Sequence, residues 1–413
     1  MQFVADFHLH SKYSRATSKD MDLENLDKWA KIKGIKVLGT GDFTHPEWFN
    51  NLKEKLEPAE VGLFKLKNSE TRFILTAEIS CIYSKKNKVR KIHIIVFAPS
   101  FEAVEKINVN LGRIGNLKSD GRPILGLDAK ELAKIVLDAS PDCLVVPAHC
   151  WTPWFSIFGS KSGFDFMEEC FEEYSKYIFA GETGISADPK MFWRISGLDK
   201  ITLISNSDSH SPAKIGREAN VFGTEISYPA IIEAIKSKNP KKFLYTIEFF
   251  PEEGRYHYDG HRLCGVSLSP QESKKYGNIC PNCGKPLTIG VLNRVEELAD
   301  RPEGFRPENV IPFKRLIPLE EIIADAFGVL SAGKRVREEY KKLISKLGNE
   351  LNILLETPLS ELKIATLPEI AEGISRVREG KVFIEPGYDG VYGKIKIFSP
   401  GERKKQLKQK ALF

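Results

Sequence analysis

Short apolar runs alternate with amphipathic stretches along the first half of the chain. Up to about residue 225, runs rich in β-branched residues are separated by segments whose apolar positions recur at helical spacing, which is typical of an α/β fold. The helical segments include Leu23 to Lys33, Ala129 to Ala139 and Asp165 to Lys176. The strand candidates are Phe3 to Phe7, Lys36 to Leu38, Arg72 to Ala77, Lys91 to Phe97, Cys143 to Pro147, Tyr177 to Ala180 and Ile201 to Ser205. This alternation predicts a closed, distorted β/α barrel of seven strands, and an open doubly wound sheet is the alternative.

The pattern changes after the barrel segment. Residues 226 to 245 have the spacing of a last helix, and the stretch from Phe249 to Gly254 interrupts it as a linker would. Between Tyr256 and Val291, Gly, Pro and Cys are frequent, so this stretch is too small to bury a core unaided. Helical spacing returns from Pro318 to Lys346 and from Leu359 to Arg378. We therefore expect a barrel over 1–240, a zinc-binding module over 250–300, a mainly helical domain over 301–400 and a basic tail over 401–413.

The composition fits a globular protein of more than one domain. The chain has 413 residues, of which 42% are hydrophobic and 28% charged, and this excludes a disordered or fibrous protein. The sequence has no signal-like start and no run of about 18 apolar residues. We expect a soluble, cytoplasmic protein with no membrane partner. The net charge of +6 is modest, and its concentration near the C-terminus is compatible with a polyanionic partner as well as with a solvated tail.

Histidine is unevenly distributed. Most of the 8 histidines fall in the barrel segment, within or directly after predicted strands, as do several acidic residues. The carboxyl ends of barrel strands converge on one mouth, and period-two spacing directs His8 with His10, and Asp208 with His210, to one side. One histidine is usually a satisfied core residue, but many imidazoles and carboxylates in one cavity are costly without cations. The sequence therefore predicts two or three divalent ions (zinc, manganese or magnesium) with these candidate ligands: His8, His10, Asp42, His45, Glu78, His93, His149, Asp208 and His210.

Such a centre limits the chemistry. Divalent ions lower the pKa of bound water and stabilise charge on the attacking and leaving oxygens, so phosphoester hydrolysis is the natural use. Amide or lactone hydrolysis is the chemical alternative, since the same nucleophile attacks a carbonyl carbon. The sequence has no Gly-x-Ser-x-Gly motif that would indicate covalent catalysis. We assign the catalytic roles to Asp208, Glu78, His8 and His10.

Residues 1 to 230 resemble the polymerase and histidinol phosphatase superfamily. The matching motifs are Asp6 to Ser11, Gly41 to His45, Ala77–Glu78, Ile92–His93, Ala148–His149 and Ser207 to His210. The resemblance implies a seven-stranded barrel that binds three metals, with Glu78 as the bridging carboxylate. The superfamily usually has a further Asp or His where this chain has Ser14–Arg15, and an Asp-His pair where it has Asp42–Phe43. His45 is therefore the candidate to replace the missing imidazole, and Asp42 the candidate to ligate directly.

The small module carries paired metal ligands. His261 and Cys264 precede Cys280 and Cys283 by a spacing that is typical of a tetrahedral zinc site on two knuckles. A shell of four protein ligands leaves no open position, so the predicted zinc is structural and supplies folding energy that the module lacks. His257 is the alternative to His261.

The order of the parts, with the segments Tyr256 to Arg262 and Arg294 to Pro302, resembles a family of DNA repair endonucleases over essentially the whole chain. The resemblance implies an enzyme that nicks DNA on the 5′ side of deaminated bases (hypoxanthine, uracil, xanthine) and of abasic sites. A small-molecule phosphomonoesterase of the histidinol-phosphatase type is the alternative, although it does not need the C-terminal modules. A non-catalytic DNA-binding scaffold, which would carry no catalytic metals, is a third hypothesis.

An enzyme that inspects a base extrudes it from the stack and holds it in an aromatic or amide-lined pocket. Trp151, Trp154 and Phe155, in the loop after His149, are candidates to stack on such a base, and a cover of core aromatics is the alternative. Glu182 and Asn206, at strand ends, are candidates to contact the base edge or the metals.

Basic residues of the C-terminal parts are expected to bind phosphates of single- or double-stranded DNA without reading sequence, which would associate the protein with the nucleoid. The last residues, Gln409 to Phe413, resemble the first half of a sliding-clamp interaction box but lack its aromatic pair. Clamp binding is therefore a further hypothesis.

Overall fold

A mixed sheet lies at the centre of the computed structural model, which describes residues 2–399 and 401–402. Its hydrogen-bonded order is β15-β12-β11-β1-β2-β5-β4-β3, with β6 and β7 also paired to β5, and β8 paired to β6. The 11 strands are β1 (Phe3–Asp6), β2 (Val37–Gly39), β3 (Leu56–Pro58), β4 (Phe64–Leu66), β5 (Arg72–Lys85), β6 (Lys88–Ala98), β7 (Ile124–Leu125), β8 (Leu144–Pro147), β11 (Ala219–Phe222), β12 (Phe243–Glu248) and β15 (Phe313–Arg315). A separate parallel pair joins β9 (Ala180–Glu182) to β10 (Thr202–Ile204).

The strand directions differ from those of the expected barrel. β1, β2 and β5 are parallel, but β11 is antiparallel to β1, and β6 is antiparallel to both β5 and β8. The reversal between β5 and β6 occurs at Lys86 and Asn87, whose φ angles of 52° and 58° form a tight turn without an intervening helix. The segment 226–245, predicted to be one helix, contains helix α7 (Tyr228–Ser237) and then β12. The α/β class is therefore confirmed with a mixed central sheet, and the closed barrel of seven strands is not confirmed.

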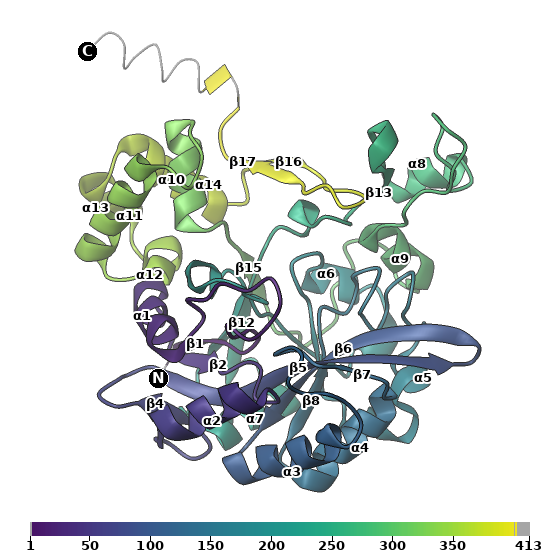
Figure 1. The fold of residues 1–413 in the computed structure, drawn as a ribbon. Coiled ribbons are helices and arrows are strands. Elements are labelled where there is room, and N and C mark those ends of the chain that lie inside the picture. Colours follow the sequence, from purple (N-terminus) through teal and green to yellow (C-terminus); the bar gives the residue numbers. More distant parts are fainter. Residues whose placement is uncertain (1, 400, 403–413) are drawn as a thin grey trace.

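Helices cover the outside of this sheet (Figure 1). α1 (Leu23–Lys33) is capped by Asp22, whose side chain accepts a hydrogen bond from the backbone N–H of Asn25, and by Gly34, which has a φ of 88°. In α4 (Ala129–Ala139) the buried residues Leu132, Ala133 and Val136 face the core. The other α-helices of this part, besides α7, are α2 (Pro46–Lys55), α3 (Phe101–Gly112), α5 (Met167–Phe171) and α6 (Pro189–Phe192).

Two smaller parts stand above the sheet, on opposite sides in Figure 1, with the hairpin of β16 and β17 between them. One contains β13 (Asp259–His261), β14 (Val266–Leu268), α8 (Pro270–Lys275) and α9 (Val291–Leu298). The other contains α10 (Leu319–Phe327), α11 (Lys334–Leu347), α12 (Glu350–Leu355), α13 (Leu359–Ala365) and α14 (Pro368–Arg378), followed by β16 (Phe383–Glu385) and β17 (Lys394–Lys396). The loop between β16 and β17 contacts the part that contains β13: the backbone N–H of Tyr258 donates a hydrogen bond to the carbonyl of Gly387 at 2.9 Å.

The helical part is connected to the main sheet by a strand. β15 pairs in parallel with β12, so residues after 301 contribute to the sheet that the N-terminal segment builds. Among the helices of the described residues, none combines the length and apolarity needed to cross a membrane. The basic tail from 403 onward, including the clamp-like Gln409 to Phe413, lies outside the described residues.

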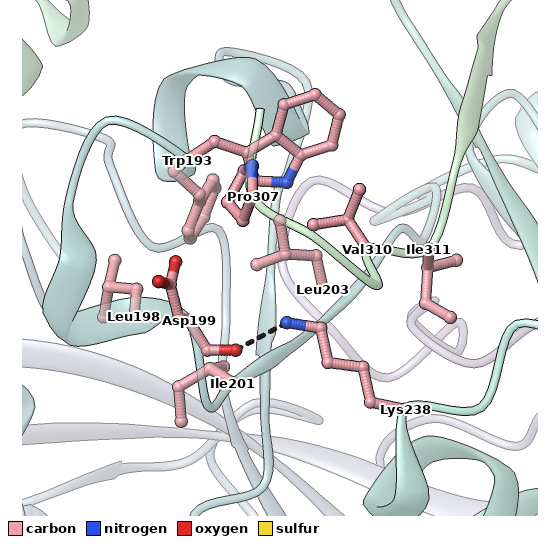
Figure 2. Close-up of a pocket in the computed structure, with 10 residues that line it drawn as sticks. Trp193, Leu198, Asp199, Ile201, Leu203, Lys238, Pro307, Val310 and Ile311 are labelled. Carbon is pink, nitrogen blue, oxygen red and sulfur yellow. Dashed lines mark hydrogen bonds between the residues drawn. The ribbon is translucent and has the colours of Figure 1, made fainter. Parts of the chain in front are cut away.

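A small cavity marks the contact between the barrel and the segment before β15 (Figure 2). Trp193, Leu203 and Val310 line it, and Lys238 closes one side by donating to the backbone carbonyl of Asp199 at 2.6 Å. Its volume of about 20 Å³ admits roughly one water molecule, so it is a gap in packing and not a substrate site.

Candidate metal centre

Most of the predicted ligands come together where three strands end and two long strands pass by. His8 and His10 follow β1, Glu78 lies in β5 and His93 in β6. His149 follows β8, and Asp208 follows β10. Three residues here have positive φ angles that non-glycine residues rarely adopt: Asp42 (51°), His149 (27°) and Asp208 (45°). Such strained positions cluster where a site fixes side-chain direction.

One group of ligand atoms is formed by His8, His10, Glu78 and Asp208, all within 4.8 Å of one another. The Nε2 atoms of His8 and His10 lie 3.4 and 3.2 Å from Oε2 of Glu78. They lie 3.6 and 3.2 Å from Oδ1 of Asp208. This geometry surrounds one cation position with two imidazole nitrogens and two carboxylate oxygens.

A second group uses the other oxygen of Glu78. Nδ1 of His93 and Nε2 of His149 lie 2.7 and 3.1 Å from Oε1 of Glu78, and 3.3 Å from each other. Burial lowers the pKa of His93 to about 4, which keeps its imidazole neutral and able to bind a metal. Glu78 therefore belongs to both groups, and a carboxylate in this position can bridge two ions.

Two buried carboxylates orient the paired histidines. Nδ1 of His8 lies 3.0 Å from Oε1 of Glu182, and Nδ1 of His10 lies 3.0 Å from Oδ1 of Asp42. Asn206 completes this support, since its side-chain amide donates to Glu182 at 2.9 Å. A hydrogen bond from Nδ1–H to a carboxylate fixes the tautomer in which Nε2 carries the lone pair.

The ligand atoms require positive charge between them. Nε2 of His8, Nε2 of His10 and Oδ1 of Asp208 are buried without a hydrogen-bond partner. Lone pairs of two imidazoles then face carboxylate oxygens, which is favourable only with a cation in between. Burial opposes ionisation of Glu78, but the positive charge of Arg122 helps to hold the pKa of its carboxyl well below the usual range. These residues therefore fit divalent metal ions.

Three predicted ligands lie outside both groups of the described residues. Asp42 accepts hydrogen bonds from the backbone N–H and hydroxyl of Ser11 and so supports His10 from behind. His45 precedes α2 and stacks on Tyr13 with ring centroids 4.5 Å apart. His210 points its Nδ1 at the backbone carbonyl of Asp208, 3.0 Å away. The resemblance implied three metals, whereas at this centre the described residues form two ligand groups.

Some of the residues predicted to contact a base are buried, and others are accessible to solvent. Trp151 is only 1% exposed and packs on Phe158 and Phe192, which corrects its predicted role as a stacking residue because a base cannot reach it. Glu182 and Asn206 are completely buried and support His8, so neither can read a base edge.

Trp154 and Phe155 remain accessible. Trp154 is 37% exposed, and its ring contacts Tyr256 edge-on at 5.7 Å. Phe155 lies against His93 with ring centroids 4.7 Å apart, so it forms a wall beside the second ligand group.

Arg122 also lies at the centre, and the sequence did not predict it there. Its Nη1 atom lies 2.9 Å from Oε2 of Glu78, although the residue comes from an irregular loop between α3 and β7. A Gly-Arg-Pro segment in a loop has no periodicity that would place it near the strand ends. Only the fold brings it there.

The small module contains a third group of metal ligands. His261, Cys264, Cys280 and Cys283 converge within 4.8 Å, with Sγ of Cys283 3.4 Å from Nδ1 of His261. Burial disfavours the Cys280 thiolate, but the backbone amides of Asn282 and Cys283 lower the pKa of its thiol to about 7. The alternative ligand His257 is buried, stacks on Tyr258 and does not belong to this group.

Comparisons with known proteins agree with this architecture. Residues 318–381 match a family model described as the MJ0043 C-terminal domain. MJ0043 of Methanocaldococcus jannaschii is 36% identical over 259 residues, which cover 60% of this chain and 31% of that protein. The chain thus spans about a third of the length of this relative.

Two solved structures are similar over nearly the whole chain. The lesion-specific endonuclease PfuEndoQ from Pyrococcus furiosus has a TM-score of 0.86 at 31% identity, covering 96% of this chain and 95% of that one. Endonuclease Q in complex with a 27-mer duplex substrate, with an abasic lesion at the active site, has a TM-score of 0.85 at 31% identity and covers 97% of each chain. The fold and the paired ligand groups define a metal-dependent phosphodiesterase of the nuclease class. The chain belongs to the endonuclease Q family.

Proposed function

We propose that this protein is a DNA repair endonuclease that hydrolyses the phosphodiester on the 5′ side of a deaminated base (hypoxanthine, uracil or xanthine) or an abasic site. The observation that carries the proposal is Glu78, shared by two groups of metal ligands. A DNA substrate is supported by the similarity of this chain, over nearly its whole length, to an endonuclease Q whose structure was solved with duplex DNA.

The chemistry needs cations with nitrogen and oxygen ligands. Zinc or manganese suits both ligand groups, the first with His8, His10, Glu78 and Asp208 and the second with Glu78, His93 and His149. Ions bound there would lower the pKa of a coordinated water and neutralise charge on the phosphate. Glu182 and Asp42 hold His8 and His10 in one orientation, so little rearrangement is needed when substrate arrives. Asp208, with 30% of its side chain exposed, is the ligand of its group that is most open to the substrate side.

The lesion itself would be extruded from the helix. A deaminated base pairs weakly and costs less to unstack, and an exposed aromatic face beside the metals could hold it. Phe155 supplies such a face against His93, and the exposed Trp154 next to it contacts Tyr256, which extends the surface toward the small module. We assign base stacking to Trp154 and Phe155.

The modules would bind the rest of the duplex. A structural zinc at His261, Cys264, Cys280 and Cys283 would order a module whose buried cluster consists only of Val266, Cys280 and Leu287. Basic side chains of this module and of the helical part would contact phosphates. Binding of the sliding clamp through the C-terminal residues remains a separate proposal.

The test uses end-labelled duplexes with one hypoxanthine, one uracil, one abasic site or no lesion, incubated with the full chain and a divalent metal. We expect a nick on the 5′ side of each lesion and none in the undamaged duplex. Asp208→Ala should abolish incision and retain DNA binding. Intact duplexes together with rapid hydrolysis of p-nitrophenyl phosphate would instead establish a small-molecule phosphomonoesterase.

A further inference from the structure

The metal centre is exposed mainly at three side chains around the first ligand group. The side chains of His8, His10 and Glu78 are at most 2% exposed, whereas those of Asp208, His210 and Arg122 are 30%, 32% and 28% exposed. Around the first ligand group, the last three side chains are therefore the ones most accessible to a substrate. Of these, the guanidinium of Arg122 carries a permanent positive charge.

The loop that carries Arg122 is fixed against the centre. Asp120 is buried and accepts hydrogen bonds from the backbone N–H groups of Arg15 and Arg122, each at 3.2 Å. The backbone N–H of Gly121 donates to the carbonyl of Tyr13 at 3.0 Å, and its carbonyl accepts from Thr44 at 3.3 Å. The position of Arg122 is thus set before substrate binds.

Glycine is required beside it. A Cβ on residue 121 would collide with the side chains of Asp42 and Ser14, so only glycine allows the loop to approach the support of His10 so closely. This close approach brings Arg122 within reach of Glu78.

Most hydrogen-bond donors of the Arg122 side chain are available for a ligand. A guanidinium has five N–H groups, and among the described residues its polar side-chain partner is Oε2 of Glu78, contacted through Nη1. Cations bound by Glu78 would compete with Arg122 for that same oxygen and so weaken the ion pair between Glu78 and Arg122. The remaining N–H groups can then be used by an anion at the mouth.

We propose that Arg122 donates hydrogen bonds to a non-bridging oxygen of the phosphodiester that is cleaved, and is a catalytic residue of this centre. The assignment rests on the phosphodiesterase activity proposed above. It adds a fixed donor to the cations, so the charge that grows on the phosphate oxygens in the transition state is stabilised without reorganisation. No bond to Arg122 forms or breaks.

The test compares Arg122→Gln and Arg122→Lys with Arg113→Gln, a matched control at an exposed arginine on the C-cap of α3. Each variant is assayed for single-turnover incision of lesion duplex and for hydrolysis of bis(p-nitrophenyl) phosphate, and its metal content is measured. We expect Arg122→Gln to slow both reactions about 100-fold at unchanged metal content, as for the loss of one oriented donor. Arg122→Lys should fall between, because an ammonium keeps the charge without the planar fork.

The outcomes separate the two proposals. If Arg122→Gln hydrolyses both substrates within about threefold of the wild-type rate, or loses rate only in proportion to lost metal, the assignment is wrong. If the wild-type chain hydrolyses the small ester but leaves lesion duplexes intact, the proposed DNA function fails while the ester still reports on Arg122. If the wild-type chain hydrolyses neither the lesion duplex nor the small ester, inorganic phosphate is titrated into the metal-loaded protein. Binding about 10-fold weaker in Arg122→Gln than in the wild type supports the contact between Arg122 and phosphate, and equal binding refutes it.

Discussion

The Nδ1 atom of His10 lies 3.0 Å from Oδ1 of Asp42, and that carboxylate also accepts hydrogen bonds from Ser11 and Ser14. With the backbone N–H of Ser11 included, a residue expected to bind metal is therefore held by four hydrogen-bond donors and orients a ligand instead. Its contribution to the centre is indirect and can be measured separately.

Asp42→Asn should weaken metal binding about 10- to 100-fold, because an amide can present its N–H to His10 and favour the wrong tautomer. Metal titration of the apoprotein checks this, and activity should return at high metal concentration. Asp20→Asn, at an exposed aspartate, is the control. Loss of activity that excess metal does not restore would indicate a direct role for Asp42.

His93→Ala should remove the cation of the second group and leave the first, because His93 belongs only to the group with Glu78 and His149. Glu78→Ala should affect both groups. Elemental analysis after dialysis is expected to find about one ion fewer per chain for His93→Ala and about two fewer for Glu78→Ala. Equal losses in the two variants would contradict the assignment of Glu78 as the shared ligand.

The stability of the barrel should depend on pH through a buried acidic pair. Burial raises the pKa of Glu248 to about 8, and burial with the neighbouring charge of Glu248 raises the pKa of Glu218 well above its usual value. The folded chain then keeps protons that the unfolded chain releases near pH 4.5. The stabilisation is complete below that pH and is lost as the pH rises through about 8, by at most about 1.4 kcal/mol per unit for each group.

Glu248→Gln should flatten this pH dependence, since the amide is neutral throughout. Urea unfolding between about pH 5 and 9 measures the slope of the unfolding free energy. Glu233→Gln, on the exposed face of α7, serves as the control. Parallel slopes for Glu248→Gln and the wild type would show that Glu248 does not contribute.

Cys280→Ser should release the metal of the small module and loosen residues 256–291, because its cluster has only three buried apolar members. Hydrogen exchange should rise in that segment, and hydrolysis of a small phosphodiester should persist, because the ligands of the barrel are unchanged. Ser267→Ala, at an exposed position in β14, is the control. Retention of the metal in Cys280→Ser would argue against four-ligand binding.

The sequence predicted the parts of the site that follow from strand geometry. His8, His10 and Asp208 come together in one ligand group, and period-two spacing of His8 and His10 after a strand is the local signal for it. His45 does not join this group, since its position depends on where α2 begins and on its packing with Tyr13. Arg122 and the role of Asp42 depend on contacts between loops far apart in sequence, which local patterns do not encode.

The fold was predictable to a similar extent. Helices α1 and α4 were predicted at their observed bounds, because caps and apolar spacing are local signals. Strand direction was not, because one two-residue turn at Lys86 and Asn87 replaced the expected crossover. The predicted boundaries also left β12 outside the first domain and put β15 in the helical one, although the two strands pair and belong to the main sheet.

That pairing has a consequence for any attempt to isolate the barrel. A fragment ending at residue 240 lacks β12 altogether, and one ending after β12 leaves its outer backbone N–H and C=O groups without β15. An unpaired strand at the rim of a sheet is a template for intermolecular pairing. The helical part therefore covers half of the edge of β12 and leaves the shorter β15 as the rim of the sheet, through three residues, Phe313–Arg315, that contribute no ligand to either group of the metal centre.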